Sequence, residues 1–478
     1  MANRTRMIPA LACLLALTAC AKAGPEYRRP EMAIPERFGA AGDWQPAQPA
    51  SPDAAWWRVM ADPELDRLEE MVTIGNADIQ VAEAQYRSAR AVMESATQAM
   101  LPTLGLSATE SRAATGKAYT TRYGVAGSAS WEVDLWGRLR RGVEGAEAKF
   151  AASGEDLASA RLSAQALLAQ VYWQLRAADR HLELLRKAIG ESGRFLRLTE
   201  TRHEAGVAAR LDVEQARTQL QNLRAQAIEV DLQRARLEHH LAMLTGKTTL
   251  QVAPWPEGKA LPAVPRAPNL IPSRVLESRP DIAAAERRVA VANAQIGVAR
   301  VAFFPALNLG AEGGYKGGVL EQLIRLPNRY WSLGPSLAFS LLDSGQRKAA
   351  LAQARAGLEQ AEAQYRQVVL TAFQEVEDDL ATARLLEREA EEQHAALEAA
   401  RRSREIAEHQ YGAGTASSLN VIVARTTEIA AERGAVDLHQ RRVLAVLQLL
   451  KNCAGRFSDA PRDPAQDISE KPPAMNRP

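Results

Sequence analysis

The chain repeats one plan twice, and this internal duplication restricts its fold more than any other feature. The segment HEAGVAARLDVEQART at 203–218 returns as YGAGTASSLNVIVART at 411–426, and eight of the sixteen positions are identical. The same offset of 208 relates Gly137 to Gly345, while an offset of 203 relates Pro102 to Pro305. The two halves are therefore two copies of one structural unit, and the second has five extra residues (208 − 203) in one loop.

Each copy is predicted to begin with a helix and to continue with a pair of strands. Asn76 or Ser278 can cap the helix, which ends before the proline at 102 or 305. Apolar and small polar residues then alternate with period two, as in LGLSATE at 104–110 and LNLGAE at 307–312. Each strand is about 10 residues long, which is enough to cross an outer membrane when tilted. A half-buried soluble sheet has the same alternation, so the strands alone fit both interpretations.

Four strands are too few to close a membrane barrel, and lipid cannot satisfy the backbone groups of an open sheet edge. Several copies of the chain must therefore share one barrel if the strands cross a membrane. Two copies would supply eight strands and three copies would supply twelve, and the residues do not choose between them. Four aromatic residues are candidates for the membrane interfaces: Tyr123, Trp131, Tyr330 and Trp331.

The third part of each copy is predicted to be a long helical hairpin. No proline occurs between residues 103 and 253 or between 336 and 460, and apolar residues from Val143 to Leu185 recur every seven positions. Sustained heptads favour coiled-coil packing. The repeated segments lie where each helix must reverse, because Gly206 and Gly414 can adopt the left-handed conformation that ends a helix. A coiled-coil tether would also have such helices, but it has no need of membrane-length strand pairs.

The amino terminus indicates export. Arg4 and Arg6 precede an apolar run that is too short to span a bilayer and resembles a secretory signal. The run ends in Leu17-Thr18-Ala19-Cys20, which resembles a bacterial lipobox, so we expect cleavage before Cys20 and acylation of its thiol. An ordinary signal cut a few residues away is the alternative. With Cys13 removed and Cys20 acylated, Cys453 is the remaining thiol, and no intramolecular disulfide is expected.

Charge and motifs exclude several classes of protein. The net charge is +2 with acids and bases interleaved, so no face for nucleic acid is indicated. Neither His203-Glu204 nor His239-His240 has the HExxH metal spacing, and a phosphate-binding glycine loop is missing. The carboxylates around Glu375 suit a solvated helix face. We therefore expect no enzyme activity, no catalytic residue, no metal and no cofactor.

The predicted organisation follows the repeat. Residues 1–19 form the signal peptide, 20–55 a lipidated strap, 246–278 an equatorial linker and 456–478 a carboxy-terminal tail. The first repeat, 56–245, contains a strand pair at 103–134 and a hairpin tip near 206. The second repeat, 279–455, contains a strand pair at 305–342 and a tip near 414.

Several motifs together resemble the outer membrane efflux proteins of the TolC family, in its branch of OprM- and NodT-like lipoproteins. They are the lipobox followed by GPEYRRP, Trp56-Trp57, Asp62-Pro63-Glu64-Leu65, Arg279-Pro280-Asp281-Ile282, Leu342-Asp343-Ser344-Gly345, the run from Ala372 to Asp378, and Tyr411-Gly412-Ala413-Gly414. The resemblance covers nearly the whole mature chain. It implies a mainly α fold with a membrane β-barrel: a homotrimeric channel-tunnel of twelve strands, four from each internally duplicated chain, and long coiled-coil helical hairpins.

The function that the resemblance implies is a passive exit duct in the outer membrane of a Gram-negative bacterium, lipid-anchored and projecting into the periplasm. Its partners would be outer-membrane lipid, a periplasmic adaptor and an inner-membrane pump, of the RND type in the commonest arrangement, and its cargo small toxic molecules. Two alternatives stay open: the outer-membrane channel of type I protein secretion, and a nonconducting lipoprotein tether.

The same resemblance places an aperture at the periplasmic tips. The tip residues are Gly206, Asp212, Gly412, Gly414, Leu419, Asn420 and Val423. Relatives carry acidic residues at the constriction, on the returning helix of the second hairpin. The matching positions here are Asn420 and Val423, so this chain departs from the acidic pattern and its cation selectivity is in doubt. Asp212 is the nearby acid, although an acid in the first turn of a helix needs no further role.

Overall fold

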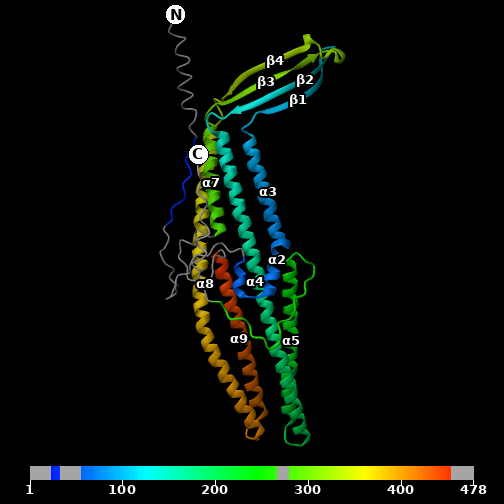
Figure 1. Cartoon of the computed structure of the whole chain (residues 1–478), viewed down its shortest axis with the longest axis vertical. Helices are drawn as coiled ribbons and strands as arrows, with labels where there is room; N and C mark the ends of the chain where they lie inside the picture. Colours follow the sequence, from blue (N-terminus) through cyan, green and yellow to red (C-terminus); the bar gives the residue numbers. More distant parts are fainter. Residues whose placement is uncertain (1–22, 33–54, 266–278, 454–478) are drawn as a thin grey trace, which may run out of the picture. The chain divides into compact units, whose positions relative to one another are not determined.

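The computed structural model describes residues 23–32, 55–265 and 279–453 (Figure 1). Cys20 and Ser278 lie outside these ranges. The elements of the first half are the 3₁₀ turn η1 (Trp56–Met60), α2 (Pro63–Gly75), α3 (Ala77–Gln98), β1 (Thr103–Thr115), β2 (Ala118–Val133), α4 (Arg138–Glu204) and α5 (Arg210–Leu244). Those of the second half are α7 (Pro280–Val301), β3 (Ala306–Gly317), the 3₁₀ turns η2 (Leu320–Gln322) and η3 (Leu326–Asn328), β4 (Arg329–Ala338), α8 (Gln346–Gly412) and α9 (Ser418–Asn452).

The element boundaries confirm the duplication. Helix α7 begins and ends 203 positions after α3. Helices α8 and α9 begin and end 208 positions after α4 and α5. The predicted change of offset therefore falls between β3 and α8. In this region the loop from β3 to β4 is longer than the corresponding loop from β1 to β2. The structure has the predicted four strands and two long helical hairpins, in which α4 and α8 have 67 residues each.

The chain divides into two compact units, and each draws on both copies. The first contains residues 23–32, 82–157 and 281–369, and the second contains the remaining described residues. The four strands, α7 and the beginnings of α4 and α8 belong to the first unit. The second unit contains α2, α5, α9 and the rest of α4 and α8. The duplicated segments thus complete each other's packing rather than folding as separate halves.

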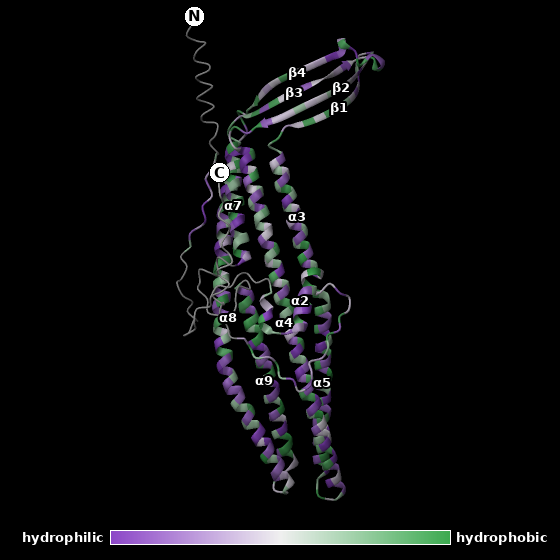
Figure 2. Ribbon diagram, in the orientation of Figure 1, coloured by the Kyte–Doolittle hydropathy of each residue, from purple (hydrophilic) through white to green (hydrophobic). Residues whose placement is uncertain are grey.

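In the first unit the strands form one antiparallel sheet in the order β1-β2-β3-β4 (Figure 1). The register places Leu104, Ala129, Ala311 and Leu333 in one row across the sheet, and Thr103, Ser130 and Gly310 in the next. Because neighbouring rows point to opposite sides, one face is apolar and the other carries small polar residues. Figure 2 shows hydrophilic and hydrophobic residues following one another along the strands. On the apolar face Leu104 is 84% exposed and Trp331 is 76% exposed.

The register separates the four aromatic residues predicted for membrane interfaces. Tyr123, Trp131 and Trp331 share the apolar face, since Gly127 of β2 is level with Trp331 across β3. Tyr123 and Trp131 lie eight residues apart on β2, a separation of about 27 Å along a strand. Tyr330 instead points to the polar face, where its hydroxyl donates to Glu312 Oε1 at 2.5 Å. A lipid-interface position does not fit Tyr330, because adjacent residues of a strand face opposite sides.

The second unit has a core of leucines and well-formed helix starts. Leu65, Leu168, Leu175 and Leu241 are fully buried, each contributing roughly 1.5–3 kcal/mol relative to exposure. Asp62 caps α2, because its Oδ1 accepts from the backbone N–H groups of Glu64 and Leu65 at 2.9 and 3.3 Å.

Asn76 is confirmed as the cap of α3, since its Oδ1 accepts from the N–H groups of Asp78 and Ile79 at 3.0 and 3.2 Å. Its Nδ2 also donates to Leu244 O at 2.9 Å, which ties the start of α3 to the end of α5. Within the described ranges, no helix combines the length and the apolar character needed to cross a bilayer.

Candidate aperture at the hairpin tips

The first hairpin turn lies between α4 and α5. Gly206 has φ +75°, in the left-handed region that favours glycine. Its N–H donates to His203 O at 2.9 Å, and the N–H of Val207 donates to Arg202 O at 2.8 Å. These bonds satisfy carbonyl groups that the end of α4 would otherwise leave without partners. The turn therefore depends on a glycine at 206.

The second turn, between α8 and α9, repeats both of these hydrogen bonds. Gly414 has φ +77°, and its N–H donates to Tyr411 O at 3.1 Å, while that of Thr415 donates to Gln410 O at 3.0 Å. Each of these residues lies 208 positions after its counterpart in the first turn. Gly412 differs, because it is the last residue of α8 and does not have a positive φ.

Asp212 lies in the first turn of α5 and makes two different contacts. Its Oδ2 accepts from the backbone N–H of Ala209 at 3.0 Å, which caps its own helix. Its Oδ1 accepts a hydrogen bond from the hydroxyl of Ser418, the first residue of α9. Ser418 is only 3% exposed. Asp212 is therefore both the first-turn acid that the sequence indicates and a direct link between the two hairpins.

The remaining aperture candidates lie on an exposed stripe of α9. Leu419 is 49% exposed and Val423 is 56% exposed, and Asn420 is exposed on the same side of the helix. Val421 and Ala424, on the opposite side, are buried. The hairpins' own core therefore does not cover this stripe. The Oδ1 atom of Asn420 accepts only a weak bond from Ser417 Oγ at 3.3 Å.

An aromatic cluster joins the hairpins close to their turns. Phe195 of α4 and Tyr411 of α8 have ring centroids 5.6 Å apart and share a buried cluster with Ala216, Val421 and Ala424. The guanidinium of Arg202, on α4, lies 4.3 Å from the centre of the Tyr411 ring. This geometry is a cation–π contact, which favours keeping the two helices together.

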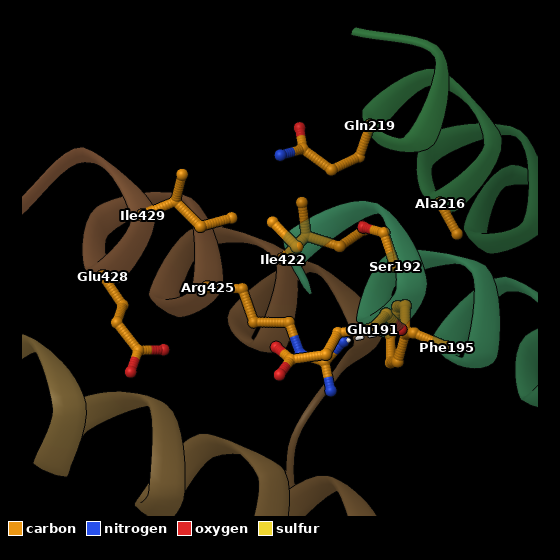
Figure 3. A pocket seen from close by; sticks show the side chains of 10 residues that line it. Glu191, Ser192, Phe195, Ala216, Gln219, Ile422, Arg425, Glu428 and Ile429 are labelled. Carbon is orange, nitrogen blue, oxygen red and sulfur yellow. Dashed lines mark hydrogen bonds between the residues drawn. The ribbon is translucent and has the colours of Figure 1, made fainter. Parts of the chain in front are cut away.

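A charged layer follows the aromatic cluster along the bundle (Figure 3). Arg425 of α9 donates to Glu191 O of α4 at 3.2 Å, and its Nη2 lies 2.6 Å from Glu408 Oε1 of α8. Glu428 lies 2.5 Å from Arg404 Nε, and burial raises the pKa of its carboxyl. Glu191, Arg425 and Glu428 border a cavity of about 20 Å³, which has room for about one water molecule. The layer joins α8 to α9 by ion pairs and α9 to α4 by a hydrogen bond to a backbone carbonyl, and it does not form a ligand pocket.

The described ranges contain no candidate metal centre. No three His, Cys, Asp or Glu side chains of these residues gather in a way that could hold a metal ion. His203 instead uses Nδ1 to contact Ala208 O at 2.8 Å, inside the first turn.

The contacts that join the hairpins include residues that sequence reasoning missed. Ser418, Arg202 and Arg425 are not among the predicted tip residues, although Arg425 lies in the repeated Ala-Arg-Thr motif. Ser418 has no sequence signal, because its counterpart in the first copy is Arg210.

Membrane-length strands and glycine-ended helical hairpins in a duplicated chain are the features expected of a channel-forming outer-membrane protein. The sequence pattern of the family described as "Outer membrane efflux protein" matches residues 70–247 and 271–455. The chain belongs to this family, whose members are outer-membrane ducts and not enzymes.

Individual relatives match over almost their full length. The chain is 29% identical to the pyoverdine export outer membrane protein OpmQ of Pseudomonas putida, covering 95% of this chain and 99% of that protein. It is 30% identical to the outer membrane protein OprJ of Pseudomonas aeruginosa, covering 95% and 96%. The solved structure of the outer-membrane channel OprN has a TM-score of 0.84 and 29% identity, over 91% of this chain and 99% of that one.

Proposed function

We propose that three copies of the chain form one exit duct through the outer membrane, as the outer-membrane component of an efflux system. The observation that carries this proposal is the sheet. In the described residues it has four strands, one apolar face and one polar face, and it ends at β1 and β4. Lipid cannot satisfy the backbone groups of these edges, so further copies must pair with them.

The number of copies follows from the need for an open lumen. Two copies would give eight strands, and side chains fill the interior of barrels of that size. Three copies give twelve strands and a wider interior. The polar face suits a lumen, because Gly105, Ser107, Ser128 and Gly310 are small and leave room for cargo.

The hairpin tips form the periplasmic aperture in this proposal. The stripe of Leu419, Asn420 and Val423 would line it, and Gly206, Gly412 and Gly414 would shape the surface that an adaptor contacts. We call the hydrogen bond from Ser418 to Asp212 the tip latch. The latch and the contact of Arg202 with Tyr411 hold the second hairpin against the first, so they favour the closed arrangement. Adaptor binding would open the aperture by breaking these contacts.

The partners in this proposal are a periplasmic adaptor and an inner-membrane pump of the RND type, which supplies the energy. Small molecules are the proposed cargo, because the relative OpmQ is described as a pyoverdine export protein. Residues 1–19 would be removed on export and Cys20 acylated, so that the lipid anchors the chain in the outer membrane. The hairpins would project into the periplasm, since a helix as long as α4 extends about 100 Å.

Electron microscopy of the purified mature protein, with conductance recordings in planar bilayers, tests the proposal. We expect threefold particles with a central channel, and ion conductance after reconstitution. A monomeric rod without conductance would refute the duct and favour the tether. Restoration of drug resistance in a strain that lacks its own duct tests the cargo, and restored secretion of a protein toxin alone would favour type I secretion.

A further inference from the structure

The first unit contains a fully buried arginine, and three of the partners named below lie in the amino-terminal segment. Arg141, near the start of α4, has no exposed surface. Its Nε donates to Ala23 O at 3.1 Å and its Nη2 to Gly24 O at 3.4 Å, while Glu26 Oε1 lies 3.1 Å from the same nitrogen. Glu144 completes the set at 2.9 Å from Nη1. A buried cation is stable only with such a set of acceptors.

Two glycines allow the amino-terminal segment to approach this arginine. Gly24 has φ +106°, and a Cβ there would lie 2.7 Å from the Cα of Gly297 in α7. A Cβ on Gly297 would lie 2.8 Å from Cγ and Cδ of Arg141. The backbone of residue 24, the stem of Arg141 and the backbone of α7 are therefore in direct contact, with no space for a further side chain. This is close packing of a built contact and not a loop resting on a surface.

The next residues continue the contact along α7. Pro25 O accepts from Asn293 Nδ2 at 3.1 Å, and the Tyr27 hydroxyl donates to Glu286 Oε1 at 3.2 Å. The other oxygen of Glu286 lies 3.3 Å from Arg29 Nε. Burial and the neighbouring Glu286 raise the pKa of Tyr27 to about 12, so its hydroxyl stays protonated as a donor.

We propose that residues 23–32 form a strap locked by Arg141, and that the lock fixes where the amino-terminal segment leaves the folded protein. The N–H of Ala23 donates to Trp136 O at 3.3 Å, in the connection from β2 to α4. Cys20 is three residues before Ala23, so it can be at most about 11 Å further along the chain. A lipid on Cys20 must therefore enter the membrane beside the point where the strands give way to helices. This second step rests on the proposed acylation.

The strap has a second consequence, because Arg141 belongs to the first copy of the repeat and Glu286, Asn293 and Gly297 belong to the second. Docking of residues 23–32 thus joins the two copies within the first unit. Arg141 is a positioning residue for the anchor: it touches neither lipid nor cargo. Loss of the lock should free the anchor and also loosen α4 from α7.

Trypsin tests the lock on the full-length mature protein in detergent. The bond between Arg28 and Arg29 is the strap's cleavable site, since Arg29 is followed by Pro30 and trypsin does not cut before proline. Cleavage requires the strap to open locally, so its rate reports the population of open strap. We expect Arg141→Met to accelerate this cut at least tenfold. Arg90→Met is the matched control, because Arg90 is an exposed helical arginine paired with Glu94, and its cut rate should equal that of the wild type.

Gly24→Val covers the case in which Arg141→Met fails to accumulate, since it changes the strap and leaves every helix intact. It should also accelerate the cut at least tenfold. The lock is refuted if the wild-type strap is cut as fast as a free peptide of residues 23–32, or if Gly24→Val, together with Arg141→Met where that variant folds, keeps wild-type protection.

Metabolic labelling with a photoreactive fatty acid tests where the anchor enters the membrane. In wild-type protein we expect crosslinks from the lipid to residues 130–140, and Arg141→Met or Gly24→Val should scatter them. Crosslinks confined to the hairpins would overturn the anchor position. A complete lack of label would refute the proposed acylation. The trypsin experiment would still test the lock, because it does not depend on the lipid.

Discussion

Removal of one hydroxyl group at the hairpin tips should release the aperture. In Ser418→Ala the Oδ1 atom of Asp212 loses its donor from the second hairpin, while its Oδ2 keeps the bond to Ala209. A hydrogen bond to a charged group contributes about 1.5–3 kcal/mol. Because about 1.4 kcal/mol is a factor of ten in an equilibrium, the opening equilibrium of each protomer should shift by roughly ten- to hundredfold.

Single-channel recording in planar bilayers measures this shift as the open probability of the purified protein. We expect long closed periods in the wild type and frequent open periods in Ser418→Ala. Ser417→Ala is the matched control, because the neighbouring hydroxyl is exposed and contacts only Asn420 in its own turn. Equal open probability in Ser418→Ala and the wild type would show that the tip latch does not hold the aperture closed. A gain in Ser417→Ala as large as that in Ser418→Ala would also contradict the reasoning.

Four further changes test other parts of the structure. Gly206→Val or Gly414→Val should each lower the free energy of unfolding by about 1–2 kcal/mol, because the positive φ of both residues strains any side chain. Gly412→Ala is the control: this exposed glycine does not have a positive φ, so the melting temperature and adaptor crosslinking should stay unchanged. Leu333→Arg, on the apolar face, should destabilise the barrel in the membrane by roughly 2–4 kcal/mol per copy and abolish insertion into the outer membrane. Ser332→Arg, one residue away on the polar face, should still insert but lower the conductance. Equal insertion of the two variants would refute the assignment of the faces. Glu69 is fully buried, neither of its carboxylate oxygens has a partner among the described residues, and burial raises its pKa to about 9. Its folded pKa exceeds the unfolded value, so stability is lost as pH rises from about 4.5 towards 9, and Glu69→Gln should remove this loss in urea titrations at pH 5 and pH 8. Asn420→Asp should add one acid per copy to the aperture and shift the reversal potential towards cation selectivity, and an unchanged potential would place residue 420 away from the constriction.

Much of the fold could be predicted because the sequence contains two copies of the same structural unit. Weak local signals, such as a glycine after a helix or a proline after another, become firm when both recur at a constant offset. In the structure the helix boundaries of one copy match those of the other to the residue, as α4 with α8 and α5 with α9 show. The faces of the sheet could be read from period-two alternation as well. The same alternation places Tyr330 and Trp331 on opposite faces. The prediction that both lie at a lipid interface relied on their being aromatic and ignored this alternation.

The contacts that hold the tips and the strap could not be predicted, because they are tertiary and unique to one copy. Arg141 lies in the run Arg138-Leu139-Arg140-Arg141, which is typical of a solvated helix start. Its burial depends on Gly297, which is 156 positions away (297 − 141), and on Gly24 in a segment that composition predicts to be extended. Pairwise geometry of this kind leaves no periodic signal in a single sequence.

The divergence of the two copies at the tips shows why a duplicated chain can still have a directional latch. Two identical copies would offer two reciprocal contacts between the hairpins, from residue 418 to residue 212 and from residue 210 to residue 420. Only the first is present: Arg210 pairs with Glu214 on its own helix, and Asn420 is exposed. The second hairpin supplies the donor, Ser418, and the first supplies the acceptor, Asp212. The bond therefore holds the buried side of α9, while the stripe of Leu419, Asn420 and Val423 stays exposed. Loss of this one bond per copy then removes the direct link between the starts of α5 and α9, whereas a symmetric pair would leave a second bond in place.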